Sequence, residues 1–315
     1  MTTPEPTPSP ISMAALPTPA AADNTASSAS RQLLTNTEVP EWYTDSFILA
    51  GYRPVTNSVK FCFHSLVYLH NETVNIYSHL LPAIACIILA SLVEWYFKVS
   101  FPKASQTDRL IFKVYLATSV ICFTISSLYH TLLCHSRSCH DLWVCIDYLA
   151  ILVQILGSIA SGIYLGFYCE PKLQTLYWSI IAAVSLATAV ITVHPRLQTP
   201  RYRLLRTMSF VATGLSAFAP IIHAASIFPY PQLDKQAGLR YYYAEGLIVL
   251  LGVVFYITRF PESWKPGVFD IWGASHQIFH ILIVTSAAVH LYGIISAFRW
   301  NYENPRCPAG SESGI

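Results

Sequence analysis

Charged side chains are scarce in this sequence. Asp, Glu, Lys and Arg make up 11% of its 315 residues, whereas a soluble globular domain carries roughly 25%. Much of the surface therefore cannot face water. The chain also lacks a block of basic residues, and its net charge is only +2. Nothing in the charge pattern indicates a protein that binds nucleic acid.

The sequence contains several long apolar runs. Hydrophobic residues make up 53% of the chain, and they gather in runs close to the ~20 residues with which an α-helix crosses a bilayer. A soluble core of this size would interrupt such runs with polar positions. The sequence therefore predicts an all-α membrane protein, in which about seven transmembrane helices form a single bundle.

The predicted spans divide the chain into four segments. The spans are residues 76–97, 110–133, 143–167, 176–193, 205–228, 242–257 and 275–298. The loops between them are short, so neighbouring spans are expected to pack antiparallel. Residues 1–40 are predicted to be a disordered tail, 41–75 a juxtamembrane segment, 76–298 the bundle and 299–315 an extracytosolic tail. Within the juxtamembrane segment, residues 59–70 fit an interfacial helix or an ordinary solvated helix equally well.

The loop between the fourth and fifth spans predicts the orientation. It holds the densest basic cluster, namely Arg196, Arg201, Arg203 and Arg206. Because Lys and Arg collect in cytoplasmic loops, this loop and the amino terminus are expected in the cytosol. The first residues match no signal peptide, so targeting is expected to come from the first span. The glycosylation sequence at residues 71–73 (NET) would then lie in the cytosol and remain unmodified.

Two histidines begin the seventh span. His276 and His280 have the i, i+4 spacing that places two imidazoles on one helix face. Gln277 occupies the position of the catalytic Glu in zinc peptidases with this spacing, so a base would have to come from elsewhere. A metal site and ordinary interfacial packing explain the pair equally well when it is taken alone.

Three further polar residues lie at span ends. His130 ends the second span, Ser126 lies one turn before it, and Asp147 begins the third span. A lone histidine there is more often a packing or capping residue. A carboxylate in a span is a functional candidate, although the dipole of a helix amino terminus also favours one.

The combination is more specific than its parts. Alternating spans place His130, Asp147, His276 and His280 at the same side of the membrane, in one layer near the cytosolic face. Three neutral histidines leave one tetrahedral position open, as in a catalytic zinc site. Asp147 is expected to be the acidic residue of this layer.

Other histidines and some of the cysteines are alternative candidates for metal ligands. His79 also lies at the cytosolic side, whereas His223 and His290 are expected to lie too far away. The loop cluster Cys134, His135, Cys139 and His140 fits no zinc module and is the less favoured metal site. The eight cysteines have irregular spacings, so no disulfide pairing follows from the sequence.

Four strings carry a resemblance to a known family. They are NETVNIYSHLLP, SSLYHTLLCHS, CIDYLAI and FDIWGASHQIFHILIVTSAAVHLYG. In this order they closely resemble the motifs of the progestin and adipoQ receptor family, which includes adiponectin receptors, haemolysin III-like proteins and fungal members. The resemblance extends from about Tyr52 to Ile295. Val74 and Pro82 depart from it, since the adiponectin-receptor branch usually has glycines there.

The resemblance implies a site and a function. It implies zinc bound by His130, His276 and His280, with Ser126 and Asp147 holding or activating the zinc-bound water, and an amino terminus in the cytosol. It also implies a receptor-like protein of the plasma membrane or an endomembrane that hydrolyses a lipid amide such as ceramide. An extracellular protein or a steroid-like molecule would be its ligand.

Two alternatives to the hydrolase stay open. One is a receptor in which zinc is structural and no reaction takes place. The other is a regulator or transporter of zinc, which is disfavoured because the spans show no second polar lane across the membrane.

Overall fold

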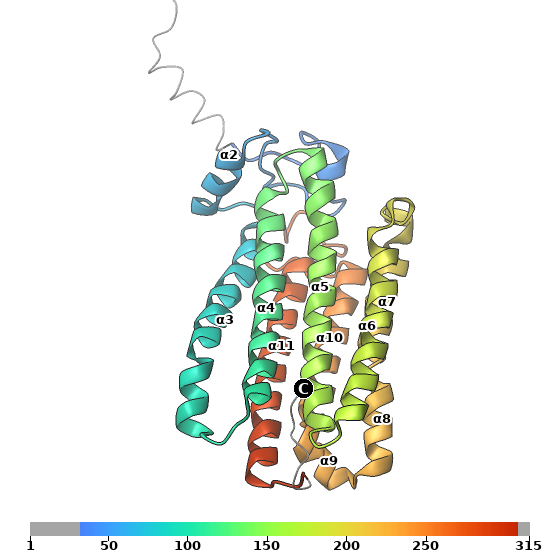
Figure 1. The fold of residues 1–315 in the computed structure, drawn as a ribbon. Helices are drawn as coiled ribbons and strands as arrows, with labels where there is room; N and C mark the ends of the chain where they lie inside the picture. Colours follow the sequence, from blue (N-terminus) through green and yellow to red (C-terminus); the bar gives the residue numbers. More distant parts are fainter. Residues whose placement is uncertain (1–31, 308–315) are drawn as a thin grey trace, which may run out of the picture.

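The computed structural model describes residues 32–307, and the long elements in this range are all α-helices (Figure 1). Seven stretches of helix within it are long and apolar enough to cross a membrane. They are α3 (Thr73–Ser100), α4 (Gln106–Leu132), α5 (Arg137–Gly166), α6 (Pro171–Val193), α7 (Arg203–Leu215) followed by α8 (Phe218–Ile227), α10 (Leu239–Thr258) and α11 (Ser275–Glu303). The predicted all-α class and seven spans are confirmed.

The fifth span differs from the prediction, because it is broken between α7 and α8 at Ser216 and Ala217. Pro220 explains the break. Proline has no N–H to donate to the carbonyl oxygen four residues earlier, so it fits best in the first turn of a helix and weakens the helix elsewhere. Pro82 lies inside α3, which continues past it, whereas at Pro220 the helix restarts. A new helix therefore begins at Phe218, just before Pro220.

Local sequence signals set other helix ends. Ser105 and Asp108 form a reciprocal capping box at the start of α4, and the Ser136 side chain accepts a hydrogen bond from the backbone N–H of Cys139 at the start of α5. Gly238, with φ +70°, separates the short helix α9 (Tyr230–Ala237) from α10. α9 was not predicted from the sequence.

A cap covers the end of the bundle where α3 begins and α4 ends. It consists of residues 32–72 and includes α2 (Val59–His64) and a 3₁₀ turn at Ser65–Val67. Leu34 pairs with Tyr52 in an isolated β-bridge, and Val39 is buried. Residues 32–40, assigned to the tail from sequence, therefore pack onto the cap. Residues 1–31 of that tail lie outside the described residues.

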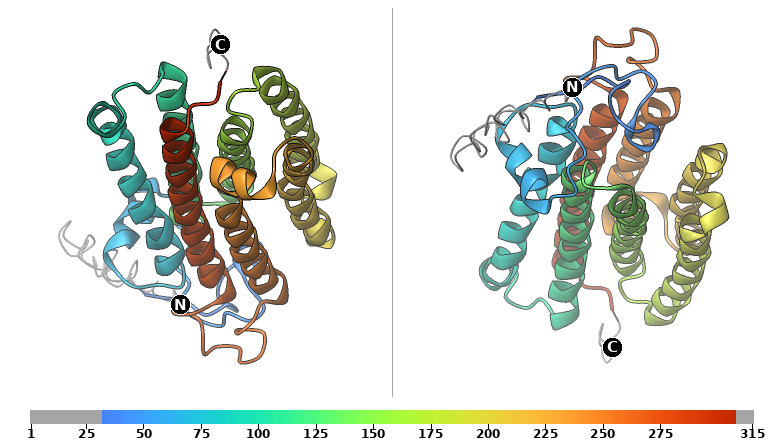
Figure 2. Two further views of the ribbon diagram at one scale, coloured as in Figure 1. Left: turned by 90° about the horizontal axis from the view of Figure 1, so that it is seen from below. Right: turned by 90° about the horizontal axis from the view of Figure 1, so that it is seen from above.

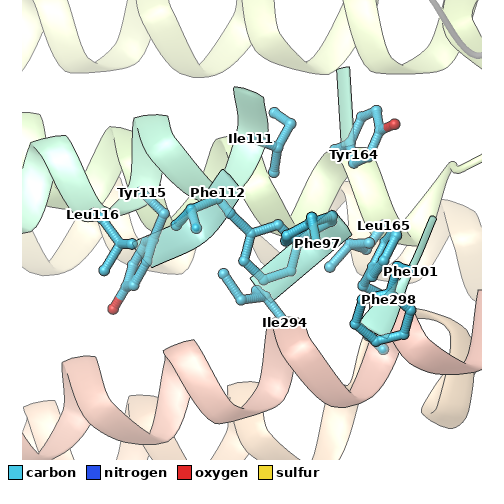
Figure 3. Close-up of a cluster of buried hydrophobic side chains, with 12 residues drawn as sticks. Phe97, Phe101, Ile111, Phe112, Tyr115, Leu116, Tyr164, Leu165, Ile294 and Phe298 are labelled. Carbon is cyan, nitrogen blue, oxygen red and sulfur yellow. The ribbon is translucent and has the colours of Figure 1, made fainter. Parts of the chain in front are cut away.

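The helices that carry the site are clamped together at the opposite end. α11 packs against α3, α5, α9 and α10, and views along the bundle show it between the α3–α4 pair and α10 (Figure 2). A buried cluster joins α3, α4, α5 and α11 (Figure 3). The ring centroid of Phe97 lies 5.1 Å from that of Phe112 and 5.2 Å from that of Phe298. In lipid such close packing, and not exclusion of water, holds helices together.

One disulfide lies at this clamped end. Cys169, in the connection between α5 and α6, is bonded to Cys307, which follows α11. At the cap end, Cys62 and Cys134 remain unbonded thiols. No pairing was predicted from the sequence, because cysteines 138 positions apart carry no local signal of their bond.

Candidate metal centre

Three histidines from two helices meet beneath the cap. His130 lies in the last turn of α4, and His276 and His280 lie in the first two turns of α11. One ring nitrogen from each lies within 4.8 Å of the others. The Nε2 atoms of His276 and His130 are 3.3 Å apart. The structure thus brings together the three ligands that the sequence predicted.

Hydrogen bonds fix the tautomers of two of these rings. His130 Nδ1 lies 2.8 Å from Glu72 Oε2, and His280 Nδ1 lies 3.2 Å from the carbonyl oxygen of Asn75. The carbonyl oxygen can only accept, and so can the ionised carboxylate. Both Nδ1 atoms therefore carry the proton, and both Nε2 atoms present a lone pair. Metal-binding histidines are commonly held in this way.

Glu72 is ionised despite its burial. Burial raises the pKa of its carboxyl, but hydrogen bonds from His130 and Asn75 outweigh this effect and hold the pKa at about 2. Both of these donors contact the same oxygen, Oε2. Glu72 therefore holds the His130 ring in place. The expectation that Asp147 would be the acidic residue of this layer is incomplete, because Glu72 lies there too.

Arg53 anchors the end of α4 that carries His130. Its side chain is fully buried. Its guanidinium donates to the carbonyl oxygens of His130 at 2.7 Å and Thr131 at 3.0 Å, and to Ser65 Oγ in the cap at 2.8 Å. The cap is thus part of the site, because it positions the backbone of a ligand.

α11 is held at its amino terminus by a second acidic residue. Glu262, in the loop before α11, accepts hydrogen bonds from the backbone N–H and the hydroxyl of Ser275. A carboxylate at this position satisfies a free N–H and complements the helix dipole. Gln277 accepts from the N–H of Gly273 and donates to the carbonyl oxygen of Ile271. Gln277 therefore braces the loop, in agreement with its inability to act as a base.

The two remaining predicted site residues face the same space. Asp147 lines a cavity of about 770 Å³ together with His130, His276 and His280. Ser126 also lines it, but its Oγ lies 2.8 Å from Nδ1 of His79. The His79 ring stacks on the ring of His280, with centroids 3.8 Å apart. His79 therefore packs against the site as a neighbour of a ligand.

The cavity extends well beyond the histidines. Its walls come mainly from α5, α7, α10 and α11 and include apolar side chains such as Phe210, Val253 and Ile283. Leu215 and Leu247 line it and are also 48% and 69% exposed on the outer surface. The cavity therefore reaches the lipid-facing side of the bundle, which suits a ligand with a long apolar chain.

The rival histidines have other partners. His223 Nδ1 lies 2.9 Å from the hydroxyl of Tyr177, and His290 lies beside Glu245. His135 and His140 contact the side chains that follow them in the chain. Across residues 32–307, the group of His130, His276 and His280 alone has the geometry to hold a metal.

The donor set suits a particular class of metal. The rings of His130 and His280 are fixed as neutral imidazoles with free Nε2 lone pairs. His276 lies one helical turn before His280 on α11. Three neutral nitrogens with a fourth position facing a cavity fit a tetrahedral or five-coordinate ion with an open site. The residues present therefore fit a bound transition-metal ion.

Comparisons with known proteins agree with the fold and with the family resemblance of the sequence. The model of the family described as Haemolysin-III related matches residues 67–291. The adiponectin receptor protein of Drosophila melanogaster is 36% identical over 81% of this chain, which spans 57% of the fly protein's length. The ADIPOR-like receptor IZH2 of Saccharomyces cerevisiae is 35% identical, covering 85% of this chain and 84% of the yeast protein.

A plant relative extends the agreement. Heptahelical transmembrane protein 3 of Arabidopsis thaliana is 30% identical over 88% of this chain and 90% of its own length. The family model, over residues 67–291, includes the NET string before α3 and the histidine pair of α11. The chain is a multi-pass integral membrane protein and belongs to the haemolysin-III related family of adiponectin-receptor-like proteins, the progestin and adipoQ receptors.

Proposed function

We propose that this protein is a zinc-dependent hydrolase of lipid amides such as ceramide, acting within the membrane as a receptor-like protein of lipid and zinc homeostasis. One observation carries the proposal: three histidines, two of them with Nε2 lone pairs fixed by hydrogen bonds, share a largely apolar cavity with the carboxyl of Asp147. The choice of ceramide rests on the family resemblance, and membrane lipids are the proposed partners.

The chain's own residues would share the work of the reaction. A zinc ion would supply Lewis-acid chemistry, which acidifies water and polarises a carbonyl. Asp147 would accept the proton of the attacking water and return it to the leaving amine. Glu72 and the carbonyl of Asn75 orient the imidazoles, and the apolar walls exclude bulk water and receive the lipid chains.

The decisive test combines two measurements on purified protein. Zinc is quantified, and turnover of ceramide is followed in the same preparation. We expect about one zinc per chain and release of fatty acid. Bound zinc without turnover of any lipid amide would reject the hydrolase and leave a receptor with a structural metal.

We also propose that the histidine layer faces the cytosol. The disulfide between Cys169 and Cys307 lies at the other end of the bundle, and disulfides persist in oxidising compartments. The unbonded Cys62 and Cys134 lie at the histidine end, as does the basic loop between α6 and α7. Both features support a cytosolic amino terminus in the plasma membrane or an endomembrane.

The glycosylation sequence tests this orientation. Asn71 lies in the cap, and its side chain is buried. We expect no glycan on Asn71 in protein made in eukaryotic cells, which mass spectrometry of the peptide will show. An engineered acceptor sequence beyond Cys307 serves as the control and should be glycosylated. A glycan on wild-type Asn71 would reverse the proposed orientation.

Replacement of Glu72 tests how the site holds its metal. Glu72→Ala removes the acceptor for His130 Nδ1, so zinc affinity is expected to fall about 10–100-fold. Glu72→Gln keeps an acceptor oxygen and should lose less. Competition with a chelator of known affinity measures both. The control is Glu94→Gln, since Glu94 pairs with Lys113 at the far end of α3. Unchanged affinity in Glu72→Ala would show that the His130 contact does not support metal binding.

A further inference from the structure

A second cluster of buried polar side chains lies in the bundle, away from the histidine layer. His290 of α11 has Nδ1 2.7 Å from Glu245 Oε2 of α10 and Nε2 2.9 Å from Ser161 Oγ of α5. His290 and Ser161 are each 1% exposed. The proposed hydrolysis uses none of these groups. Ionisable residues at membrane depth are costly and usually serve a function.

The hydrogen bonds determine where the protons lie. Ser161 Oγ is 3.0 and 2.9 Å from the carbonyl oxygens of Gly157 and Ser158, which can only accept. The single hydroxyl proton goes to them, so His290 Nε2 must donate to Ser161. The short contact between His290 Nδ1 and Glu245 then contains one shared proton. Whichever atom holds this proton, the pair has no net charge, and a low-dielectric site tolerates it.

The cluster is not a nucleophilic triad in spite of its residue types. A catalytic serine must present its oxygen to a substrate and pass its proton to the histidine. The Ser161 proton points to its own helix, and neither Ser161 nor His290 lines the cavity. Glu245 alone of the three reaches the cavity wall.

Two acceptor oxygens on that wall have no protein donor. Glu245 uses Oε2 for His290, and Oε1 makes no hydrogen bond within residues 32–307. Gln154 of α5 is 9% exposed and lines the same cavity, and its Oε1 is buried without a partner. A buried acceptor without a donor is costly, so Gln154 Oε1 indicates a ligand that donates a hydrogen bond. Glu245 Oε1 is partly exposed on the same wall and offers such a ligand a second acceptor.

Helix geometry gives the spacing between the two polar layers. His290 follows His280 by ten residues, which corresponds to about 15 Å along α11. On α10, Tyr256 contacts His276 with ring centroids 5.8 Å apart. Glu245 lies eleven residues from Tyr256, about 16 Å along the helix. Measured from the different histidines, the two helices place the Glu245 layer about 15–20 Å from the histidine layer, along one cavity.

We propose that Glu245 and Gln154 form a second polar subsite, which binds a hydroxyl group on the acyl chain of a lipid whose amide lies at the histidines. The lipid's position rests on the proposed function. A hydroxyl fits because it is neutral and donates a hydrogen bond. A charged amine or carboxylate would lack a counter-charge beside the neutral Glu245–His290 pair.

A scan of hydroxyl position tests this subsite. The probes are N-acyl sphingoid amides of one chain length, without a chain hydroxyl, with one beside the carbonyl, or with one about 15 Å from the amide. Binding to the purified full chain in lipid nanodiscs and release of fatty acid are both measured. We expect about tenfold tighter binding of the distal hydroxyl amide than of the plain amide. The hydroxyl beside the carbonyl should bring no such gain.

Variants assign the preference to the subsite. Glu245→Leu should abolish it, so that the distal hydroxyl amide binds no more tightly than the plain amide. Glu245→Gln should retain it, since an amide can donate to His290 Nδ1 and still present an oxygen to the cavity. Gln154→Leu removes the second acceptor without touching the Glu245–His290 pair, and should weaken the preference even if Glu245→Leu fails to fold.

The outcomes separate this inference from the proposed reaction. Equal binding of all probes by the wild type, binding of none, or an unchanged preference in Gln154→Leu and Glu245→Leu would overturn the subsite. A preserved preference without hydrolysis of any probe would reject the hydrolase and support the subsite. Hydrolysis of all probes without a preference would support the hydrolase and overturn the subsite.

Discussion

Simultaneous replacement of His276 and His280 by alanine is expected to remove the bound metal. The double variant leaves His130 as the single nitrogen of the three-histidine group. One imidazole cannot hold a transition-metal ion against exchange with water when the site normally supplies three ligands. Zinc should fall from about one per chain to a small fraction of that value, as measured by elemental analysis of the purified protein.

A matched histidine variant controls for general damage to the bundle. His223→Ala removes a histidine that bonds Tyr177 outside the metal layer, and it should keep its zinc. Full zinc occupancy in the double variant would place the metal elsewhere. The loop cluster at Cys134, His135, Cys139 and His140 would then be the next position to test, although its side chains make other contacts in the structure.

The spans and the histidine layer could be predicted because their signals are local or follow from the alternating direction of successive spans. Run length alone locates a membrane helix, and the i, i+4 spacing alone places His276 and His280 on one face. The end of α4 then meets the start of α11 because successive spans reverse direction. No long-range contact had to be known for these steps.

The supports of the site could not be predicted in this way. Glu72 and Arg53 lie in a stretch without membrane periodicity, and their partners are found only after the cap has folded onto α4. The string NETVNIYSHLLP contains Glu72, but spacing gives it no role. Pro220 was a local signal for the break in the fifth span, and it was overlooked because the hydropathy continues across it.

The second polar cluster was missed for a related reason. The absence of a second polar lane was used against a transporter, yet Gln154, Ser158 and Glu245 line the cavity at membrane depth. Each lies alone in an apolar run of its own helix, and only packing brings them together. The spans therefore contain a second polar cluster, although not a polar lane across the membrane. The cluster does not extend to a continuous path, because the buried aromatic cluster around Phe97 and Phe298 fills the far end of the bundle.

Asp147→Asn is expected to separate the reaction from metal binding. Asp147 lines the cavity with the histidines, but it is not in the group whose atoms can hold the metal. The asparagine side chain has nearly the same shape and cannot accept a proton near neutral pH. Loss of general-base assistance slows a reaction by about 10²–10⁴-fold. Most of the zinc should remain, although loss of a group that supports a ligand or bound water can weaken affinity by ~10–100-fold.

The measurement is a single-turnover ceramide assay on wild type and Asp147→Asn, with zinc quantified in the same samples. Glu72 is the rival base, since it is also an ionised carboxylate beside His130. Its Oε2 already accepts from both His130 and Asn75, so any loss of rate in Glu72→Gln should follow its modest loss of zinc, whereas Asp147→Asn should lose rate at nearly constant zinc. Equal rates at equal zinc in wild type and Asp147→Asn would eliminate Asp147 as the base. If neither protein turns over ceramide while both keep zinc, the metal is structural, and a ligand-dependent signal becomes the activity to measure.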